Sequence, residues 1–474
     1  MQAPSRYHHR MLEHHAFKAY DVRGTHPNEI DERGMFAIGR ALADELEPES
    51  VAVGHDMRTM ARSCADALVA GLAEAGVQVL DIGMVGTEVL YSTVGDLGLD
   101  AGIQVTASHN PAGYIGAKVV RRRAIPMGLD SGLARLRDRA LAIHGQLPAD
   151  LPAAPADRVA PHDPWPAYGE ALARFIDPDT IAPMTVVFDA ANGMGGRMVE
   201  SLLEALPITA IRCNFEPDGT FPNHEPNPLL PENRQFILDQ VAASGADLGV
   251  AWDGDADRCF FIDDTGEFVP GDFTTALIGR HLLERHAAHG SDGDRPAVIH
   301  DVRASWAVAD TIEAAGGRAV ASRVGHAFIK HRMREEDAIF GGEVSGHYYF
   351  RDFHFVDSGI IPVLVMLQLV SEAGGSLSAL LADLRSRYHL SGEINSRVDD
   401  VPLKLQQLKE RYADARISHV DGVSIEYEDW RCNIRASNTE PLLRLNLEAR
   451  SQELMESRRD ELLELIRSGS RARL

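Results

Sequence analysis

Short apolar runs alternate along most of the chain with longer segments of helical periodicity. This order occurs three times, with apolar runs at 51–58, 185–189 and 297–303, and each copy later reaches a polar loop. Strand–helix–strand units of this kind predict mixed or largely parallel sheets covered by helices, with ligands beyond the carboxyl ends of the strands. We therefore predict three related α/β domains whose polar loops face one central cleft.

The pattern changes after Ser386, where short strand-like runs precede a helical segment at about 451–468. This change predicts a smaller α+β domain at the C-terminal end. A linker rich in Pro, Ala and Asp at 146–166 suggests a further boundary, and the proline-rich stretch 213–233 is expected to be a loop. The predicted domains are 1–160, 161–270, 271–387 and 388–474.

The length, charge and cysteine content of the chain limit the kinds of fold, binding partner and cellular compartment that we expect. The chain has 474 residues, more than one hydrophobic core usually supports, and its formal net charge of −23 argues against nucleic acid or an anionic membrane as partner. Its four cysteines lack a Cys-x-x-Cys spacing that could hold zinc, which is typical of a reduced cytoplasm. The apolar stretch 359–370 is too short to cross a bilayer and predicts a buried helix.

A serine and a histidine follow the apolar run 101–105. The Asn-Pro pair at 110–111 predicts a turn, so Ser108 and His109 should lie on a loop at a strand's end. Such a loop can carry a nucleophile, but a polar turn that bonds only its own backbone is an equal alternative. The neighbours of the serine are not those of the Gly-x-Ser-x-Gly nucleophile elbow.

Three carboxylates alternate directly after the apolar run 248–252, at Asp253, Asp255 and Asp257. Clustered carboxylates repel one another unless a cation joins them, and oxygen ligands favour a hard divalent ion such as Mg²⁺. An EF-hand is excluded because it needs glycine where Arg258 stands and helices on both sides. A solvated acidic turn remains the alternative.

Two further loops are rich in polar and charged side chains. The segment 342–347, Gly-Glu-Val-Ser-Gly-His, is too polar for a core strand and too rich in glycine for a helix. The segment 435–441 and Arg444 combine arginines, whose forked donors match phosphate oxygens, with Ser, Asn and Thr donors. An ordinary polar loop and an Asn-capped turn are the respective alternatives.

These four loops resemble those of the α-D-phosphohexomutase family, the phosphomannomutase/phosphoglucomutase enzymes. TASHNP, with the following Tyr114, Gly116 and Lys118, is similar to the family's serine loop, and DGDADR to its metal loop. GEVSGH is similar to its sugar loop, in the form found in enzymes that handle mannose and glucose phosphates, and RASNTEP to its phosphate loop. The resemblance extends in order from Phe17 to about Glu448.

The resemblance implies an intramolecular phosphotransferase that interconverts hexose 6-phosphates and hexose 1-phosphates of mannose or glucose. Ser108 would carry the phosphoryl group, and glucose 1,6-bisphosphate or mannose 1,6-bisphosphate would be both intermediate and activator. The implied catalytic residues are Ser108, His109, Lys118, Arg23 and His347. The implied Mg²⁺ ligands are Ser108, Asp253, Asp255 and Asp257. The implied substrate-binding residues are Tyr20, Arg258, Arg303, Gly325, His326, Glu343, Ser345 and His347. The implied phosphate-binding residues are Arg435, Ser437, Asn438, Thr439 and Arg444.

The sequence is also compatible with three other functions. A metal-dependent sugar phosphatase would use the same serine and metal without a second phosphate loop, and a non-catalytic sensor would not need both. Phosphoglucosamine mutase is disfavoured by the GEVSGH and SNTEP sequences. The family usually has Asn where this chain has Ile115, and losing an amide there removes hydrogen-bonding capacity beside the serine loop. We expect small sugar phosphates as partners, a monomer or dimer, and a cytoplasmic location.

Overall fold

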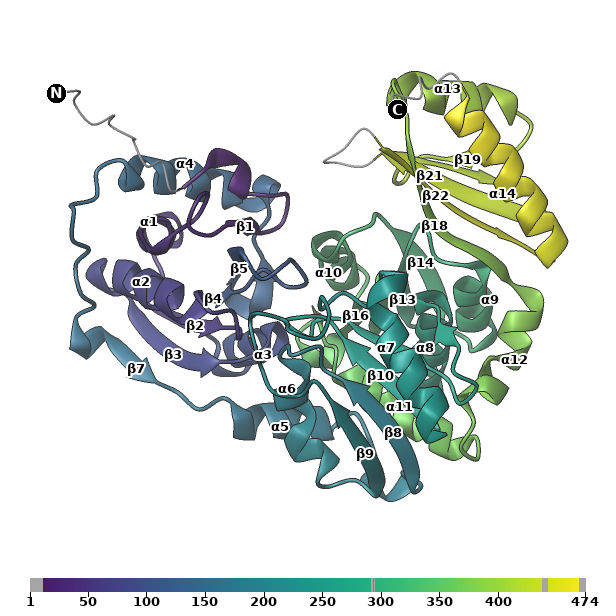
Figure 1. Cartoon of the computed structure of the whole chain (residues 1–474), viewed down its shortest axis with the longest axis horizontal. Helices are drawn as coiled ribbons and strands as arrows, with labels where there is room; N and C mark the ends of the chain where they lie inside the picture. Colours follow the sequence, from purple (N-terminus) through teal and green to yellow (C-terminus); the bar gives the residue numbers. More distant parts are fainter. Residues whose placement is uncertain (1–11, 291–292, 294, 437–441, 469–474) are drawn as a thin grey trace. The chain divides into compact units, whose positions relative to one another are not determined.

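The computed structural model describes residues 12–290, 293, 295–436 and 442–468 (Figure 1). Its contacts divide the chain into two units. Unit 1 comprises Met1–Phe268 and Asp352–Gly375, and unit 2 comprises Val269–Arg351 and Ser376–Leu474. The four sheets of the predicted fold are present, so the prediction of three α/β domains and a smaller α+β domain is confirmed.

The first sheet of unit 1 is mixed. Its strands lie in the order β1 (Val22–Thr25), β5 (Tyr114–Arg121), β4 (Ala101–Val105), β2 (Ser50–His55), β3 (Gln78–Met84) and β7 (Val159–Pro161), with β6 (Ile125–Pro126) beside β5. Strands β4, β2, β3 and β7 are parallel, whereas β5 runs antiparallel to β1 and β4. Strand β7 falls within the stretch 146–166 that the sequence predicted as a linker. This part of the stretch is a strand, because its backbone pairs with β3 at the edge of the sheet.

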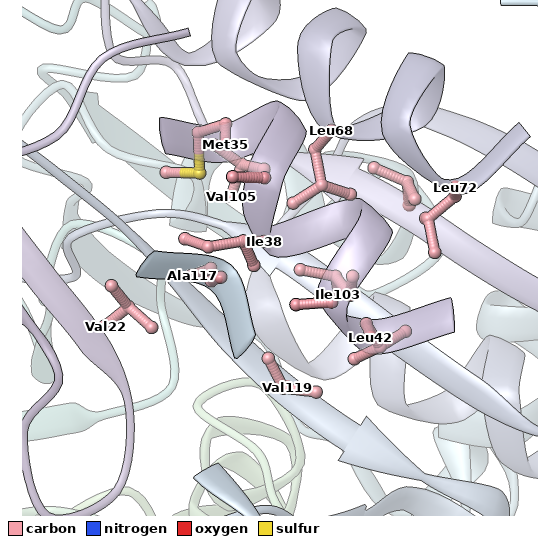
Figure 2. Packing of buried hydrophobic residues seen from close by; sticks show 14 of the residues in the cluster. Val22, Met35, Ile38, Leu42, Leu68, Leu72, Ile103, Val105, Ala117 and Val119 are labelled. Carbon is pink, nitrogen blue, oxygen red and sulfur yellow. The ribbon is translucent and has the colours of Figure 1, made fainter. Parts of the chain in front are cut away.

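Helices α1 (Glu32–Leu46) and α2 (Ala61–Glu74) cover one face of this sheet (Figure 1). Asp31 caps α1, since its carboxylate accepts a hydrogen bond from the Gly34 N–H. The helices approach closely through glycines: a Cβ on Gly39 would lie 2.3 Å from the Leu68 carbonyl oxygen. Figure 2 shows the resulting core, in which Ile38 of α1 and Leu68 of α2 meet Ile103 of β4.

The remaining helices of this part are α3 (Thr87–Leu97) and α4 (Leu133–His144). The second sheet of unit 1 has the order β12 (Phe268–Val269), β11 (Cys259–Ile262), β10 (Leu248–Trp252), β8 (Met184–Asp189) and β9 (Ile208–Cys213). Its helices are α5 (Trp165–Ala173), α6 (Gly195–Leu203) and α7 (Pro231–Ser244). The returning segment of unit 1 contains α11 (Ile361–Glu372) and a short strand, β17 (Val356–Asp357), that is not part of this sheet. Helix α11 is buried almost throughout, which confirms the predicted buried helix.

Unit 2 contains the other two sheets. One has the order β14 (Arg318–Ser322), β13 (Ala297–Asp301), β15 (Phe340–Gly342) and β16 (Tyr348–Phe350), with helices α8 (Gly271–Ala288), α9 (Trp306–Ala314), α10 (His326–Glu335) and α12 (Leu377–Arg387). The last sheet is antiparallel, with the order β18 (His389–Arg397), β22 (Leu442–Ala449), β21 (Trp430–Ala436), β20 (Val423–Glu426) and β19 (Arg416–Ser418), and it carries α13 (Val401–Arg411) and α14 (Gln452–Arg467). Within the described residues, no single helix is long and apolar enough to cross a membrane, and only α11 and α12 taken as a pair reach that length and hydropathy.

A buried carboxyl group, that of Glu88, joins three segments of unit 1. Its Oε1 accepts hydrogen bonds from the Tyr168 hydroxyl at 2.5 Å and the Ser358 hydroxyl at 2.9 Å. Its Oε2 accepts one from the Gly359 N–H at 2.6 Å. Burial raises the pKa of Glu88 to about 8, although these three donors oppose the shift. Glu88 therefore links α3 to α5 and to the segment before α11.

We expect the Glu88→Gln variant to lose part of the protein's pH dependence of stability. Because the folded-state pKa is raised, the native protein binds the extra proton, and its stability falls as pH rises from about 4.5 to about 8. Glutamine mimics the protonated form, since the Tyr168 and Ser358 hydroxyls can also accept its N–H groups. The parent should match the variant at pH 5 and be less stable by a few kcal/mol, about 3 to 5, at pH 8.5.

Thermal unfolding at both pH values, followed by circular dichroism, measures this difference. The exposed Glu170 of α5 supplies the matched control, and Glu170→Gln should leave the pH profile of the parent unchanged. Parallel pH profiles for the parent and Glu88→Gln would contradict the role assigned to this buried carboxyl group.

Candidate functional site

Ser108 lies on the loop that follows β4, as predicted, and only 2% of its surface is exposed. Its backbone has φ of +48°, in the left-handed region, which a residue other than glycine adopts only when its surroundings enforce it. The Ser108 hydroxyl donates to Asp253 Oδ2 at 2.9 Å and lies 3.1 Å from His109 Nδ1. The loop therefore presents the hydroxyl to the carboxylate cluster rather than to its own backbone.

The serine loop is held by Arg58, which follows β2. Its guanidinium donates to four carbonyl oxygens, those of Ser108, Asn110, Pro111 and Tyr114, at 2.6 to 3.1 Å. Asp56 pairs with Arg58 at 3.3 Å and accepts a hydrogen bond from the Thr106 hydroxyl at 2.7 Å. Since Arg58 and Asp56 are both buried, these bonds fix the loop against the sheet.

The metal loop follows β10 and brings its three carboxylates together. Asp253, Asp255 and Asp257 are at most 4% exposed, and one oxygen of each lies within 4.8 Å of the others. The loop reaches the serine because residue 254 is glycine: a Cβ there would lie 2.5 Å from the Ser108 carbonyl oxygen. The two predicted loops, which are far apart in the sequence, therefore form one site within unit 1.

Two cations balance this cluster. Lys118 of β5 donates from Nζ to Asp255 Oδ2 at 2.6 Å and also contacts Asp257 Oδ2. Burial opposes its charge, but Asp255 and Asp257 raise the pKa of Lys118 well above its ordinary value. Arg258 donates to Asp253 Oδ2 from Nη2 at 2.8 Å and from Nε at 3.0 Å. Through these two hydrogen bonds Arg258 orients Asp253. The predicted role of Arg258 in substrate binding stays a prediction.

The cluster has the chemistry of a magnesium site. Asp255 Oδ1 is buried and accepts no hydrogen bond from any described residue, so it has a free acceptor position. Burial raises the pKa of Asp253 to about 7; Arg258 opposes the shift, and Asp257 and Asp255 add to it. A divalent cation bound by carboxylate oxygens would relieve this repulsion. The donor set therefore fits Mg²⁺.

Other predicted residues of unit 1 lie beside the serine loop. Arg23 of β1 donates to the Asn110 side chain at 2.8 Å and to Asp21 at 2.8 Å, and Tyr20 lies in the bend before β1. Desolvation, followed by the charges of Arg258 and Arg23, lowers the pKa of His109 well below its ordinary value, so its imidazole is neutral at pH 7. Ile115 is fully buried and belongs to the hydrophobic core of unit 1.

In unit 2, the loop between β15 and β16 holds Glu343, Ser345 and His347. Glu343 is buried, and its carboxylate accepts hydrogen bonds from the Gly325 N–H at 2.8 Å and the Tyr349 hydroxyl at 2.5 Å. Burial and then Asp301 raise the pKa of Glu343 to about 7, while Arg303 and Tyr349 oppose the shift. Ser345 Oγ lies 3.0 Å from His347 Nδ1, and the His347 ring stacks at 6.4 Å on His326.

Three arginines of unit 2 converge on one carboxylate, that of Glu393 in β18. Arg444 contacts Oε1 at 2.9 Å, and Arg435 and Arg303 contact Oε2 at 3.3 and 3.5 Å. Arg435 and Arg444 stand directly opposite each other on β21 and β22, so they repel unless an anion lies between them. Burial favours the neutral form of Glu393, but Arg303, Arg444 and Arg435 lower its pKa overall.

The arginine cluster also keeps unused donors. The Nε atoms of Arg435 and Arg444 are buried and have no hydrogen-bond partner among the described residues. Arg303 differs, because Asp301 engages it at both Nε and Nη2. The single carboxylate of Glu393 therefore leaves the guanidinium groups of Arg435 and Arg444 with unused hydrogen-bond donors. A phosphate group, with several acceptor oxygens, could bind these donors.

Family models of four domains match the chain in order. The phosphoglucomutase/phosphomannomutase alpha/beta/alpha domains I, II and III match residues 14–140, 166–266 and 270–388, and the C-terminal domain matches residues 393–465. The chain belongs to the phosphoglucomutase/phosphomannomutase family. The resemblance inferred from the four loops is thereby confirmed.

Similar proteins of this family cover nearly the whole chain. A protein named phosphohexose mutases from Xanthomonas campestris is 43% identical over 457 residues, which are 95% of this chain and 99% of that protein. A phosphomannomutase of Escherichia coli strain K12 is 41% identical over 463 residues, 95% of this chain and 98% of its own. A crystal structure of a phosphoglucomutase/phosphomannomutase family protein from Burkholderia thailandensis has a TM-score of 0.84 at 28% identity, covering 97% of this chain and 99% of that one.

The structure brings the predicted residues of this mutase-family chain into groups within each unit. In unit 1 the serine, metal and Arg23 segments meet. In unit 2 Asp301 binds both the sugar loop, through the Val344 N–H, and Arg303, and the Glu393 carboxylate connects Arg303 to Arg435 and Arg444. The predicted phosphate ligands Ser437, Asn438 and Thr439 lie outside the described residues.

Several residues that hold the site were missed by sequence reasoning. They are Asp56, Arg58, Thr87, Asp301, Tyr349 and Glu393. For Asp56 and Arg58 a signal existed, because they directly follow the apolar run of β2, where the rule for parallel sheets places functional residues.

Proposed function

We propose that this chain interconverts hexose 6-phosphates and hexose 1-phosphates of mannose and glucose through a phosphoserine at Ser108. A bound hexose 1,6-bisphosphate would be the intermediate, and added glucose 1,6-bisphosphate or mannose 1,6-bisphosphate the activator. The observation that carries the proposal is the Ser108 hydroxyl, 2.9 Å from Asp253 in a buried cluster of three carboxylates. Membership of the phosphoglucomutase/phosphomannomutase family agrees with this chemistry.

The carboxylates Asp253, Asp255 and Asp257, with a phosphoserine oxygen at Ser108, are the proposed ligands of Mg²⁺. When bound, the ion would neutralise negative charge on the phosphoryl group in transfer. Arg58 fixes the serine loop through four carbonyl oxygens, so the hydroxyl keeps its place. Arg258 orients Asp253 in the same way.

Protons must move to and from the sugar hydroxyl and the serine. His109 is neutral and lies 3.1 Å from Ser108 Oγ, so it can accept the serine proton. Lys118 keeps its charge, which suits it to stabilise negative charge beside the transferring group. Arg23 and His347 are further proposed catalytic residues.

Unit 2 would bind the sugar hydroxyls and the phosphate that is not reacting. Glu343 and Ser345 are proposed to read sugar hydroxyls, with Tyr20, Arg303, Gly325, His326 and His347 as further substrate contacts. The phosphate that is not reacting would bind Arg435 and Arg444, whose unused Nε donors support this role, together with Ser437, Asn438 and Thr439. The domain boundaries, the shared cleft and the cytoplasmic location stay predictions.

The arginine cluster also weighs against a sugar phosphatase. A phosphatase releases its product after one phosphoryl transfer, so it gains little from a second phosphate site. A mutase must retain a bisphosphate while the sugar turns around, and the distant phosphate is the natural handle. Phosphoglucosamine mutase remains an alternative of the same chemistry, which differs in the sugar that Glu343 and Ser345 contact.

A turnover assay with three substrates tests the proposal. We expect the 1-phosphates of mannose and glucose to be converted to 6-phosphates in the presence of Mg²⁺ and glucose 1,6-bisphosphate, with little free phosphate released. Conversion of glucosamine 1-phosphate should be slower. A strong preference for glucosamine 1-phosphate would overturn the substrate assignment, and release of inorganic phosphate as the main product would overturn the mutase assignment.

A further inference from the structure

The first turn of α3 lies directly against the metal loop. The Thr87 hydroxyl donates a hydrogen bond to Asp255 Oδ2, and the Thr87 N–H donates to the Asp255 carbonyl oxygen at 3.3 Å. Thr87 is fully buried, so water cannot replace either bond. One threonine therefore holds both the side chain and the backbone of Asp255.

This approach depends on the residue before the helix. Gly86 is the N-cap of α3, and a Cβ there would lie 2.9 Å from the Asp255 carbonyl oxygen and 2.1 Å from Met198 Sδ. Any larger residue would push the helix away from the metal loop. The helix N-terminus also carries a partial positive charge, which favours the nearby Asp255 carboxylate.

The other side of the metal loop is fixed by the residue after Thr87. Glu88 accepts a hydrogen bond from the Gly359 N–H, and the Gly359 carbonyl oxygen accepts one from Trp252 Nε1 at 2.8 Å. A Cβ on Gly359 would lie 2.4 Å from the Ala256 carbonyl oxygen. Neighbouring residues of one helical turn therefore support the metal loop from two directions.

These contacts determine the orientation of the Asp255 carboxylate. Its Oδ2 is occupied by Thr87 and Lys118, whereas its Oδ1 is buried and has no hydrogen-bond partner among the described residues. Without the Thr87 hydroxyl, rotation about the last side-chain bond of Asp255 would be less restricted, and the free oxygen would lose its fixed direction. A metal ligand needs that direction to be set before the ion arrives.

We propose that Thr87 is a positioning residue of the metal site, which orients Asp255 for a divalent cation. The inference rests on the proposed function, because it assigns Mg²⁺ to the carboxylate cluster. Hydrogen-bond partners of metal ligands typically contribute ten- to a hundredfold to metal affinity or activity. Thr87→Val keeps the shape of the side chain and removes its donor, whereas Thr87→Ser keeps the donor.

Direct Mg²⁺ titration by calorimetry, on protein whose Ser108 carries no phosphoryl group, tests the inference without measuring activity. Thr87→Val should bind Mg²⁺ about ten- to a hundredfold more weakly than the parent, and Thr87→Ser within about threefold of it. Thr93→Val is the matched control on the same helix, since among the described residues the Thr93 hydroxyl donates only to the Val89 carbonyl oxygen, at 2.7 Å. Circular dichroism should give the same folded signal for all three variants.

The outcomes separate this inference from the proposed function. If the parent binds Mg²⁺ and Thr87→Val binds it equally well, the positioning role is wrong while the metal site stands. Equal losses in Thr87→Val and Thr87→Ser would show that packing rather than the hydroxyl matters, and would also overturn it. A parent that binds no Mg²⁺, either without the phosphoryl group or after phosphorylation of Ser108, overturns both. If Thr87→Val does not fold, a loss in Thr87→Ala that Thr87→Ser does not share supports the role, and equal affinities contradict it.

Discussion

Replacing Ser108 with alanine is expected to lower mutase turnover by about 10⁴-fold or more, because it removes the group that carries the phosphoryl in every cycle. Substrate binding should change little, since the sugar and distal-phosphate contacts proposed above lie mainly in unit 2. The measurement is the rate of glucose 1-phosphate conversion with saturating glucose 1,6-bisphosphate and Mg²⁺, together with substrate affinity by calorimetry.

The control for this variant is Ser63→Ala, an exposed serine of α2 whose hydroxyl donates to Glu32 rather than to the metal loop. Its turnover should equal that of the parent. If Ser108→Ala keeps more than a few per cent of the parent rate, another residue receives the phosphoryl group, and the assignment of the serine loop fails.

Arg435→Ala is expected to raise the KM for glucose 1-phosphate strongly. Removing one partner of a charged, partly buried contact typically costs about 2 to 5 kcal/mol, mainly through faster dissociation. At about 1.4 kcal/mol per factor of ten, that corresponds to a KM increase of about 30-fold or more. The bisphosphate should also escape more often, so turnover should depend more steeply on added glucose 1,6-bisphosphate. Phosphorylation of Ser108 by excess donor should survive, because the metal site is unchanged.

The matched control is Arg416→Ala, an arginine of β19 that is 80% exposed and pairs only at the surface with Glu426. It should leave both KM and the activator requirement unchanged. Should Arg435→Ala behave like this control in both measurements, the arginine cluster would be an ordinary feature of the β-sheet surface, and the retention of the intermediate would need another explanation.

The elements that could be predicted from the sequence are those whose apolar pattern is continuous. The run 101–105 corresponds to β4 and the run 248–252 to β10, and every residue of both strands is buried. The prediction of a loop at 213–233 was wrong at its end, where α7 begins at Pro231. Proline in the first turn of a helix needs no N–H partner, so the residue that suggested a loop is a helix start.

The candidate site, too, could be predicted from the sequence only in part. Each loop was predicted from its own residues together with their resemblance to the family's loops, since the residues alone left an ordinary polar turn as the alternative. The residues that hold the loops were not, because their partners are distant in sequence. Arg58 contacts a carbonyl 50 residues away, and Thr87 contacts a carboxylate 168 residues away. Only the fold brings such pairs together.

Ser108 is proposed to carry the phosphoryl group during catalysis. Peptide-level mass spectrometry after incubation with glucose 1,6-bisphosphate and Mg²⁺ tests it most directly, with Ser108→Ala treated in parallel. We expect one phosphoryl group on the peptide that contains Ser108 in the parent, its loss on adding excess glucose 1-phosphate, and none in the variant. A phosphoryl group on any other residue, or equal labelling of the variant, would contradict the assignment of Ser108.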